Sequence, residues 1–251
     1  MPELNKANRE VCDVDIRILS TMAPFLKFDT ANTTTTGLSS DSVHAMAKGS
    51  RRIAFANPLE GTMTIEAQVY PFKLFSLLSD GTIESSAAYA DSKIVTCSEA
   101  GKLNIDVVGG KMIKPGTIFV YPEGEYGDDD SLIKGTYADN IFTATEENQI
   151  TAGSNYEVAY IVIDTSVKKI TFNNKKLPKD YYITQKTVEK DEDGWLTPFI
   201  ITAYKATIQR TFELSFSSEG EPASVTLTFD LMEDKDGNVI DMVELTSDVV
   251  A

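Results

Sequence analysis

The hydrophobic period changes midway through GTMTIEAQVYPFKLFSLLSDG, residues 61–81. As far as Tyr70, apolar and polar residues alternate, and this period of two predicts a half-buried strand. After Pro71 the apolar residues recur at spacings of three and four, which predicts a short helix with one apolar stripe. Pro71 suits the first turn of that helix and Gly81 its exit. We therefore expect a strand that runs directly into a helix. The helix should pack through Phe72, Phe75 and Leu78, with Leu74 and Leu77 beside them.

The predicted strand has an apolar and a polar side, and a predicted hairpin over residues 206–231 repeats the pattern around the turn SSEGEPAS. The apolar sides comprise Met63, Ile65, Ala67 and Val69 in the strand, and Ala206, Ile208, Phe212, Leu214, Phe216, Val225, Leu227, Phe229 and Leu231 in the hairpin, where Arg210 interrupts them. The polar sides comprise Thr62, Thr64, Glu66, Gln68, Thr207, Gln209, Thr211, Glu213, Ser215, Ser224, Thr226, Thr228 and Asp230.

These thirteen outward positions include no Lys or Arg. A solvated sheet face normally carries several, because Lys and Arg are common surface residues and protect sheet edges. An ordinary solvated face of small polar residues is one interpretation. The other is a surface from which positive charge is excluded.

The remaining sequence indicates a mainly β protein. Short strands separated by turn residues are predicted within residues 11–19, 51–56, 102–108, 117–122, 132–144, 156–163 and 239–245, which is typical of a sandwich or barrel. The Thr-rich segment 29–42 lacks periodicity and is interpreted as a loop. We expect an N-terminal arm and loop over residues 1–50, followed by one β domain over residues 51–251 with an elaborated middle segment near 85–160.

Composition excludes some classes of function. The chain has 251 residues, with 23 Lys and Arg against 38 Asp and Glu, for a formal net charge of −15. Such a charge argues against a surface that holds nucleic acid or anionic lipid. No apolar run approaches the roughly 20 residues of a membrane span, and the charged N-terminus does not resemble a secretory signal, so we expect a protein made in a cytoplasm. Cys12 and Cys97 match no metal or redox spacing and are expected to be reduced.

The candidate catalytic and ligand-binding residues form no convincing set. His44 is the only histidine, which leaves no Ser-His-Asp set to argue for. The sequences around Gly194 and Gly237 lack the last ligand of a calcium loop and are interpreted as Asp-Gly turns. The run 128–130 is interpreted as a solvated acidic loop. We expect no enzyme, no metal and no cofactor.

In order along the chain, GTMTIEAQVYPFKLFSLLSDG, GTIFVYPEGEYG, ITAGSNYEVAYIV, LPKDYYITQ, TPFIITAYKATIQRTFELSF and VTLTFDLMEDKDGNVIDMV resemble the tail tube proteins of tailed bacteriophages. The resemblance covers residues 50–245 and implies two packed antiparallel sheets with a short flanking helix. It also implies homo-hexameric rings that stack into a tube, with tape measure, sheath or other tail proteins as partners. The genome would pass through the lumen, in a virion assembled in the host cytoplasm.

A wall that lets DNA pass should not bind phosphate, which accounts for a polar face without cations. The resemblance therefore implies that the lumen is lined by Thr64, Glu66, Gln68, Gln209, Thr211, Glu213, Thr226 and Thr228. The alternatives are a carbohydrate-binding or adhesin-like β-sandwich that uses the loops of Trp195 and Tyr126, and another virion component such as a tail terminator or decoration protein.

Overall fold

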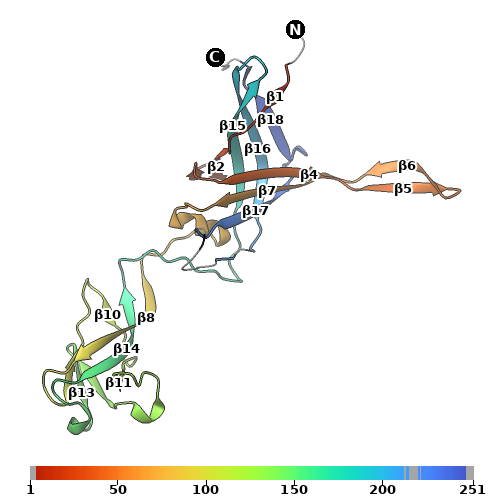
Figure 1. The fold of residues 1–251 in the computed structure, drawn as a ribbon. Helices are drawn as coiled ribbons and strands as arrows, with labels where there is room; N and C mark the ends of the chain where they lie inside the picture. The colour runs from red at the N-terminus through yellow and green to blue at the C-terminus, as the bar shows by residue number, and fades with distance from the viewer. Residues whose placement is uncertain (1–3, 212, 215–219, 221, 247–251) are drawn as a thin grey trace. The chain divides into compact units, whose positions relative to one another are not determined.

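The computed structural model describes residues 4–211, 213–214, 220 and 222–246. The chain divides into two compact units: Met1–Thr82 with Thr171–Ala251, here called unit 1, and Ile83–Ile170, here called unit 2. The expected boundary near residue 50 does not separate compact units, because residues before it form strands of unit 1. Unit 2 contains the whole of the middle segment predicted near residues 85–160. The fold is mainly β with antiparallel pairing throughout the described strands, as expected (Figure 1).

Unit 1 is built on a nine-stranded sheet with the order β3-β2-β15-β16-β17-β7-β4, in which β1 also pairs with β15 and β18 with β16. These strands are β1 (Lys6–Ala7), β2 (Asp13–Ile18), β3 (Pro24–Phe28), β4 (Thr33–Ser39), β7 (Glu60–Ala67), β15 (Asp180–Asp191), β16 (Leu196–Ile208), β17 (Val225–Met232) and β18 (Ile240–Glu244).

Strand β16 connects the two halves of this sheet. Its residues 199–203 pair with β18 and its residues 205–208 pair with β17, while its other edge pairs with β15. Figure 1 shows β4, β7 and β17 running across β15 and β16. Fully buried side chains from both halves, such as Ile16, Ile183, Met63 and Phe229, form one core cluster between them. The two packed sheets that we expected are therefore two halves of one continuous sheet.

The helix after Pro71 is a 3-10 helix, η1 (Phe72–Leu78). Leu78 is 1% exposed, and Phe75 is partly buried against the core cluster of unit 1. Phe72 is 43% exposed, which corrects the expectation that it packs beneath the sheet. Leu74 and Leu77, expected beside these residues on the same stripe, are buried, and their spacing of three places them on one face of a 3-10 helix. Phe72 is the first residue of the helix. Val69, expected on the buried side, is also exposed, because β7 ends at Ala67.

The Thr-rich segment is not a loop. Residues 33–39 form β4, which pairs with β7 along its length, so the loop interpretation of residues 29–42 is wrong. Thr34 and Thr36 face the protein interior, where Thr34 Oγ1 accepts the backbone N–H of Cys12 and Thr36 Oγ1 donates to Gln185 Oε1. A threonine hydroxyl can bond to buried polar groups, so a strand can form here without apolar alternation.

Strands β5 (Ser42–Ala47) and β6 (Ser50–Ala56) form a separate two-stranded hairpin between β4 and β7. Figure 1 shows this hairpin projecting from the rest of unit 1. Most of its side chains are exposed, including four large apolar ones: Val43, Met46, Ile53 and Phe55.

Unit 2 has its own core and two small sheets. One contains β8 (Ala87–Thr96), β10 (Met112–Ile113), β11 (Phe119–Pro122) and β14 (Asn155–Asp164); the other contains β9 (Lys102–Asn104), β12 (Gly135–Ala138) and β13 (Ile141–Ala144). Short helices η2 (Asp129–Ser131) and η3 (Glu147–Gln149) lie in its loops. Its core cluster includes Leu103, Phe142, Tyr156 and Val158. Strand β8 was not predicted, because its sequence does not alternate clearly.

Candidate functional site

Three neighbouring strands of unit 1 present one continuous polar face. Their pairing places Thr33 beside Glu66 and Thr226, Thr35 beside Thr64 and Thr228, and Gly37 beside Thr62 and Asp230. Residues at paired positions on adjacent strands point to the same side of a sheet. The intervening residues of β7 and β17, among them Met63 and Phe229, are buried in the core. The face is therefore fixed by the burial of its apolar counterpart.

Hydrogen bonds connect the side chains of this face. Thr64 Oγ1 and Thr228 Oγ1 lie 3.3 Å apart. Gln209 extends the face beyond the end of β16, because its backbone N–H donates to Thr228 O at 2.8 Å and its Nε2 donates to Asp230 Oδ1 at 2.6 Å. The face is thus a fixed array of hydroxyl, amide and carboxylate groups.

The polar face of β4, β7 and β17 carries no Lys or Arg at the positions the structure describes. The nearest cation in the register is Lys205 of β16, opposite Met232. Lys205 Nζ lies 3.8 Å from Asp180 Oδ2, so an adjacent carboxylate offsets its charge. The face carries the carboxylates of Glu66 and Asp230 and no offsetting base, so its electrostatic character is acidic.

The structure brings together most of the residues that sequence predicted for this face, but not all. Thr64, Glu66, Thr226 and Thr228 lie in register. Gln209 is hydrogen-bonded to Thr228 O and to Asp230 of the same strand. Gln68 follows the end of β7, where its backbone N–H donates to Asn32 Oδ1 at 2.9 Å.

Two of the predicted residues, Thr211 and Glu213, are exposed and lie outside any strand, because β16 ends at Ile208. The predicted strand therefore ends earlier than alternation suggested, and Leu214, expected on its buried side, is 37% exposed. The predictions for Phe212, Ser215 and Phe216 lie outside the described residues.

Sequence reasoning missed Thr33 and Thr35, which widen the face by a whole strand. Four consecutive threonines, residues 33–36, were the available signal, since threonine favours strands. The signal was masked because threonines on both sides of a strand leave no alternation to detect.

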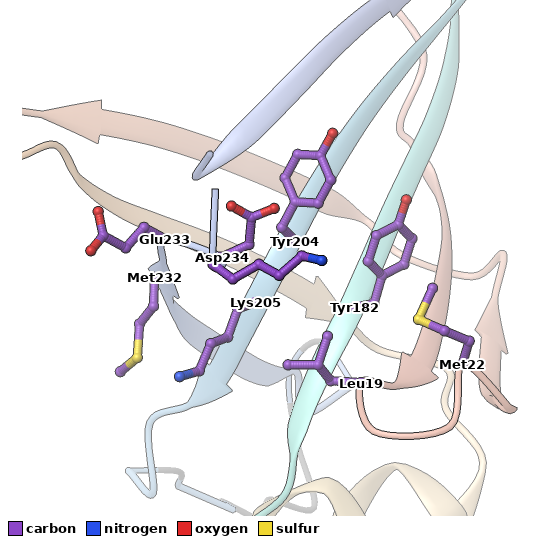
Figure 2. Close-up of a pocket in the computed structure, with 9 residues that line it drawn as sticks. Leu19, Met22, Tyr182, Tyr204, Lys205, Met232, Glu233 and Asp234 are labelled. Atoms are coloured by element: carbon purple, nitrogen blue, oxygen red, sulfur yellow. The ribbon is translucent and has the colours of Figure 1, made fainter. Parts of the chain in front are cut away.

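A surface pocket of unit 1 offers the main alternative site (Figure 2). Two of its polar groups, those of Tyr204 and Asp234, already have partners. Tyr204 donates to the carboxylate of Asp241, and this hydrogen bond is the main reason that the pKa of Tyr204 rises to about 12. The backbone N–H of Asn238 is the main cause of a lowered pKa for Asp234, whose carboxylate holds a turn. Neither group is available as an acid or base near neutral pH. The pocket is lined by Leu19, Met22, Tyr182, Tyr204, Lys205, Met232, Glu233, Asp234 and Lys235.

Other candidate sites are also weak. Within the described residues, no cluster of three His, Cys, Asp or Glu side chains is arranged to hold a metal ion. Trp195 lies in the turn between β15 and β16 of unit 1, and Tyr126 lies in a loop of unit 2, where it packs on Tyr121 with ring centroids 5.7 Å apart. None of the helices in the described part of the chain has the length and hydropathy to cross a membrane.

Comparison with known proteins identifies the family. No curated protein sequence matches the chain significantly. A family model does match: that of the YomU/Tube protein family, over residues 9–244. The match includes residues of both compact units and all three strands of the polar face, β4, β7 and β17. With nearly the whole chain matched, the protein belongs to the YomU/Tube family, a family of phage tube-type structural proteins found in the virion tail.

Proposed function

We propose that this protein is a tail tube subunit whose copies form hexameric rings, that the rings stack into a tube, and that the genome passes through the lumen during delivery into the host. Family membership supports a structural role in the tail. The observation that carries the proposed lumen is the polar face of β4, β7 and β17, which forms the inner wall in this account.

The chemistry of the face suits passing DNA. Each Lys or Arg on a lumen wall would release counterions from a phosphate and hold it, so a wall rich in cations would slow DNA. Hydroxyl groups of Thr35, Thr64 and Thr228 bind water instead, and the carboxylate of Glu66 repels phosphate. Such a wall is wetted without binding its cargo.

Unpaired sheet edges support self-assembly. Among the described residues, β4 pairs only with β7 and β3 only with β2, so both ends of the sheet order expose one edge of backbone N–H and C=O groups. β4 carries no Lys or Pro that would protect its edge, whereas β3 carries Pro24 and Lys27. A ring closed by strand pairing between copies removes an unprotected edge such as that of β4. In this proposal the sheets of neighbouring copies join through these edges, and the polar faces form one wall.

The protein acts in this account as a structural component and not as an enzyme. Its partners are other copies of itself and further tail proteins, such as a tape measure or sheath protein, and assembly takes place in the host cytoplasm. DNA passes without sequence recognition.

Imaging and sedimentation of the purified protein test this proposal. We expect rings or short tubes at high protein concentration, or after addition of tail initiator components. A compact monomer under all of these conditions would contradict it.

A further inference from the structure

Unit 2 presents an apolar sheet face that its own core does not cover. In the register of β8, β14 and β11, Ser92 lies beside Ala159 and Phe119. The rows on either side place Ile94 beside Glu157 and Tyr121, and Ala90 beside Ile161. The opposite side of the same strands forms the core cluster of unit 2. We call this uncovered surface the β8/β14/β11 face.

This face is too apolar to be an ordinary solvated surface. Ile94 is 56% exposed and Phe119 is 46% exposed, and Met112, which pairs with Ile163 at the far end, is 60% exposed. Contiguous apolar patches on soluble proteins usually mark an interaction site. The exposed apolar residues therefore indicate that this face binds a protein partner that presents apolar side chains.

Acidic residues border one end of the face. Glu157 lies on the face itself. Tyr126, which packs on Tyr121, lies in a loop that carries Glu123, Glu125 and the acidic run 128–130. Unit 2 as a whole has 14 Asp and Glu against 7 Lys, a net charge of −7. A partner for this face should therefore carry positive charge beside its apolar groups.

The β5–β6 hairpin has these properties. Val43 pairs with Phe55 and Ala45 with Ile53, which places an apolar ladder on one side of the hairpin. Val43, Ile53 and Phe55 are each 58–60% exposed. From Ser42 to Ala56 the chain has Lys48, Arg51 and Arg52 and no acidic residue, although the whole protein has a net charge of −15.

We propose that the β5–β6 hairpin of one copy docks on the β8/β14/β11 face of a second copy. The apolar ladder covers Ile94 and Phe119, and the cationic tip lies near Glu157 and the acidic loop. Pairing two β8/β14/β11 faces would instead bring two acidic borders together, which charge repulsion opposes. The inference rests on the proposed self-assembly and names two surfaces that meet in it.

Disulfide trapping between two copies tests this contact. Ala45→Cys is placed on the hairpin of one protein and Ser92→Cys on the face of another, because both residues are small and exposed and their replacement keeps the apolar anchors. Both proteins carry Cys12→Ser, while the buried Cys97 is retained. The control partner carries Thr143→Cys, which is exposed on the other sheet of unit 2.

The two proteins are mixed and mildly oxidised, and the yield of disulfide-linked dimer is measured. We expect the yield for Ala45→Cys with Ser92→Cys to be at least tenfold higher than the yield for Ala45→Cys with Thr143→Cys. Adding Arg51→Glu and Arg52→Glu to the hairpin protein should lower the yield to the control level. Adding Glu123→Lys and Glu125→Lys to its partner should restore it. Equal yields for the two partners, or no effect of the charge changes, would overturn the proposal.

A protein with both cysteines in one chain separates contacts between copies from a contact within one. Our proposal predicts linked oligomers from this variant, and a linked monomer would overturn it. Imaging the wild-type protein in parallel separates this inference from the proposed function. Rings without the cross-link would overturn the inference and leave the tube proposal standing, whereas the cross-link without rings or tubes would support the inference and contradict the tube.

Discussion

Units 1 and 2 each contain an antiparallel sheet with one side on its own core, but their uncovered sides have opposite chemistry. In unit 1 the uncovered face carries threonines, with Glu66 and Asp230 among them. In unit 2 it carries Ile94, Phe119 and Ile161. A hydroxyl-rich surface is well hydrated in water, whereas covering an apolar surface with a partner lowers the free energy of the system. The comparison suggests a wetted wall in unit 1 and a protein contact in unit 2.

Separate cores make the comparison testable at the level of stability. Phe229 in unit 1 and Phe142 in unit 2 belong to different core clusters and are 0% and 3% exposed. Replacing either by Ala should destabilise its own unit by about 3–5 kcal/mol. Hydrogen exchange should then rise mainly in the unit that carries the substitution. Equal increases in both units would show that the two do not unfold separately.

The helix η1 sharpens the comparison between buried and exposed groups in unit 1. Leu77 is 0% exposed, so Leu77→Ala should destabilise the protein by about 2–5 kcal/mol. Phe72 is 43% exposed, and Phe72→Ala should cost clearly less than Leu77→Ala. Denaturant unfolding of the two variants measures the difference. A cost for Phe72→Ala that matches that of Leu77→Ala would mean that Phe72 packs inward, as the sequence first suggested.

Acid should weaken unit 2 through Asp164, at the end of β14. The backbone N–H of Ser166 at 2.8 Å is the main cause of a pKa below its usual value of 3.8, and Tyr89 and Lys111 add to it. A lowered folded-state pKa stabilises the protein above pH 3.8, and this contribution is lost as the pH falls below that value.

Asp164→Asn should therefore lower the melting temperature of unit 2 at neutral pH, and the gap to wild type should narrow below pH 3.8. Thermal unfolding followed across this range provides the measurement. A gap that stays constant with pH would show that the carboxylate does not contribute through its charge.

Alternation in the sequence predicted much of the fold and part of the polar face. It located β7, β17 and β14, because burial of one side leaves a period of two. It missed β4, where Thr34 and Thr36 satisfy buried polar groups in place of apolar contacts. Alternation also extended β16 too far, since a pattern does not reveal where strand pairing ends.

The uncovered face of unit 2 could not be predicted in this way. Ile94, Ala159 and Phe119 lie on three strands, and only the pairing register brings them together. A local pattern cannot distinguish an apolar residue that faces a core from one that faces a partner.

The central claim is that the polar face of unit 1 lines the path of the genome. Its most direct test is the rate of DNA ejection from virions whose tube protein carries Thr35→Lys, Glu66→Lys and Thr226→Lys, which together raise the net charge of the face by four units. The control carries Glu146→Lys and Glu147→Lys, which raise the net charge by the same four units at exposed positions of unit 2. Glu66 is half-buried and the other four positions are exposed. Surface substitutions usually change stability within about 0.5 kcal/mol, so both proteins should fold.

We predict that the face variant assembles and ejects DNA more slowly than the control, and that the difference grows at low ionic strength, because phosphates then bind the added cations more strongly. Virions of the face variant that eject DNA at the control rate at low salt would contradict the claim.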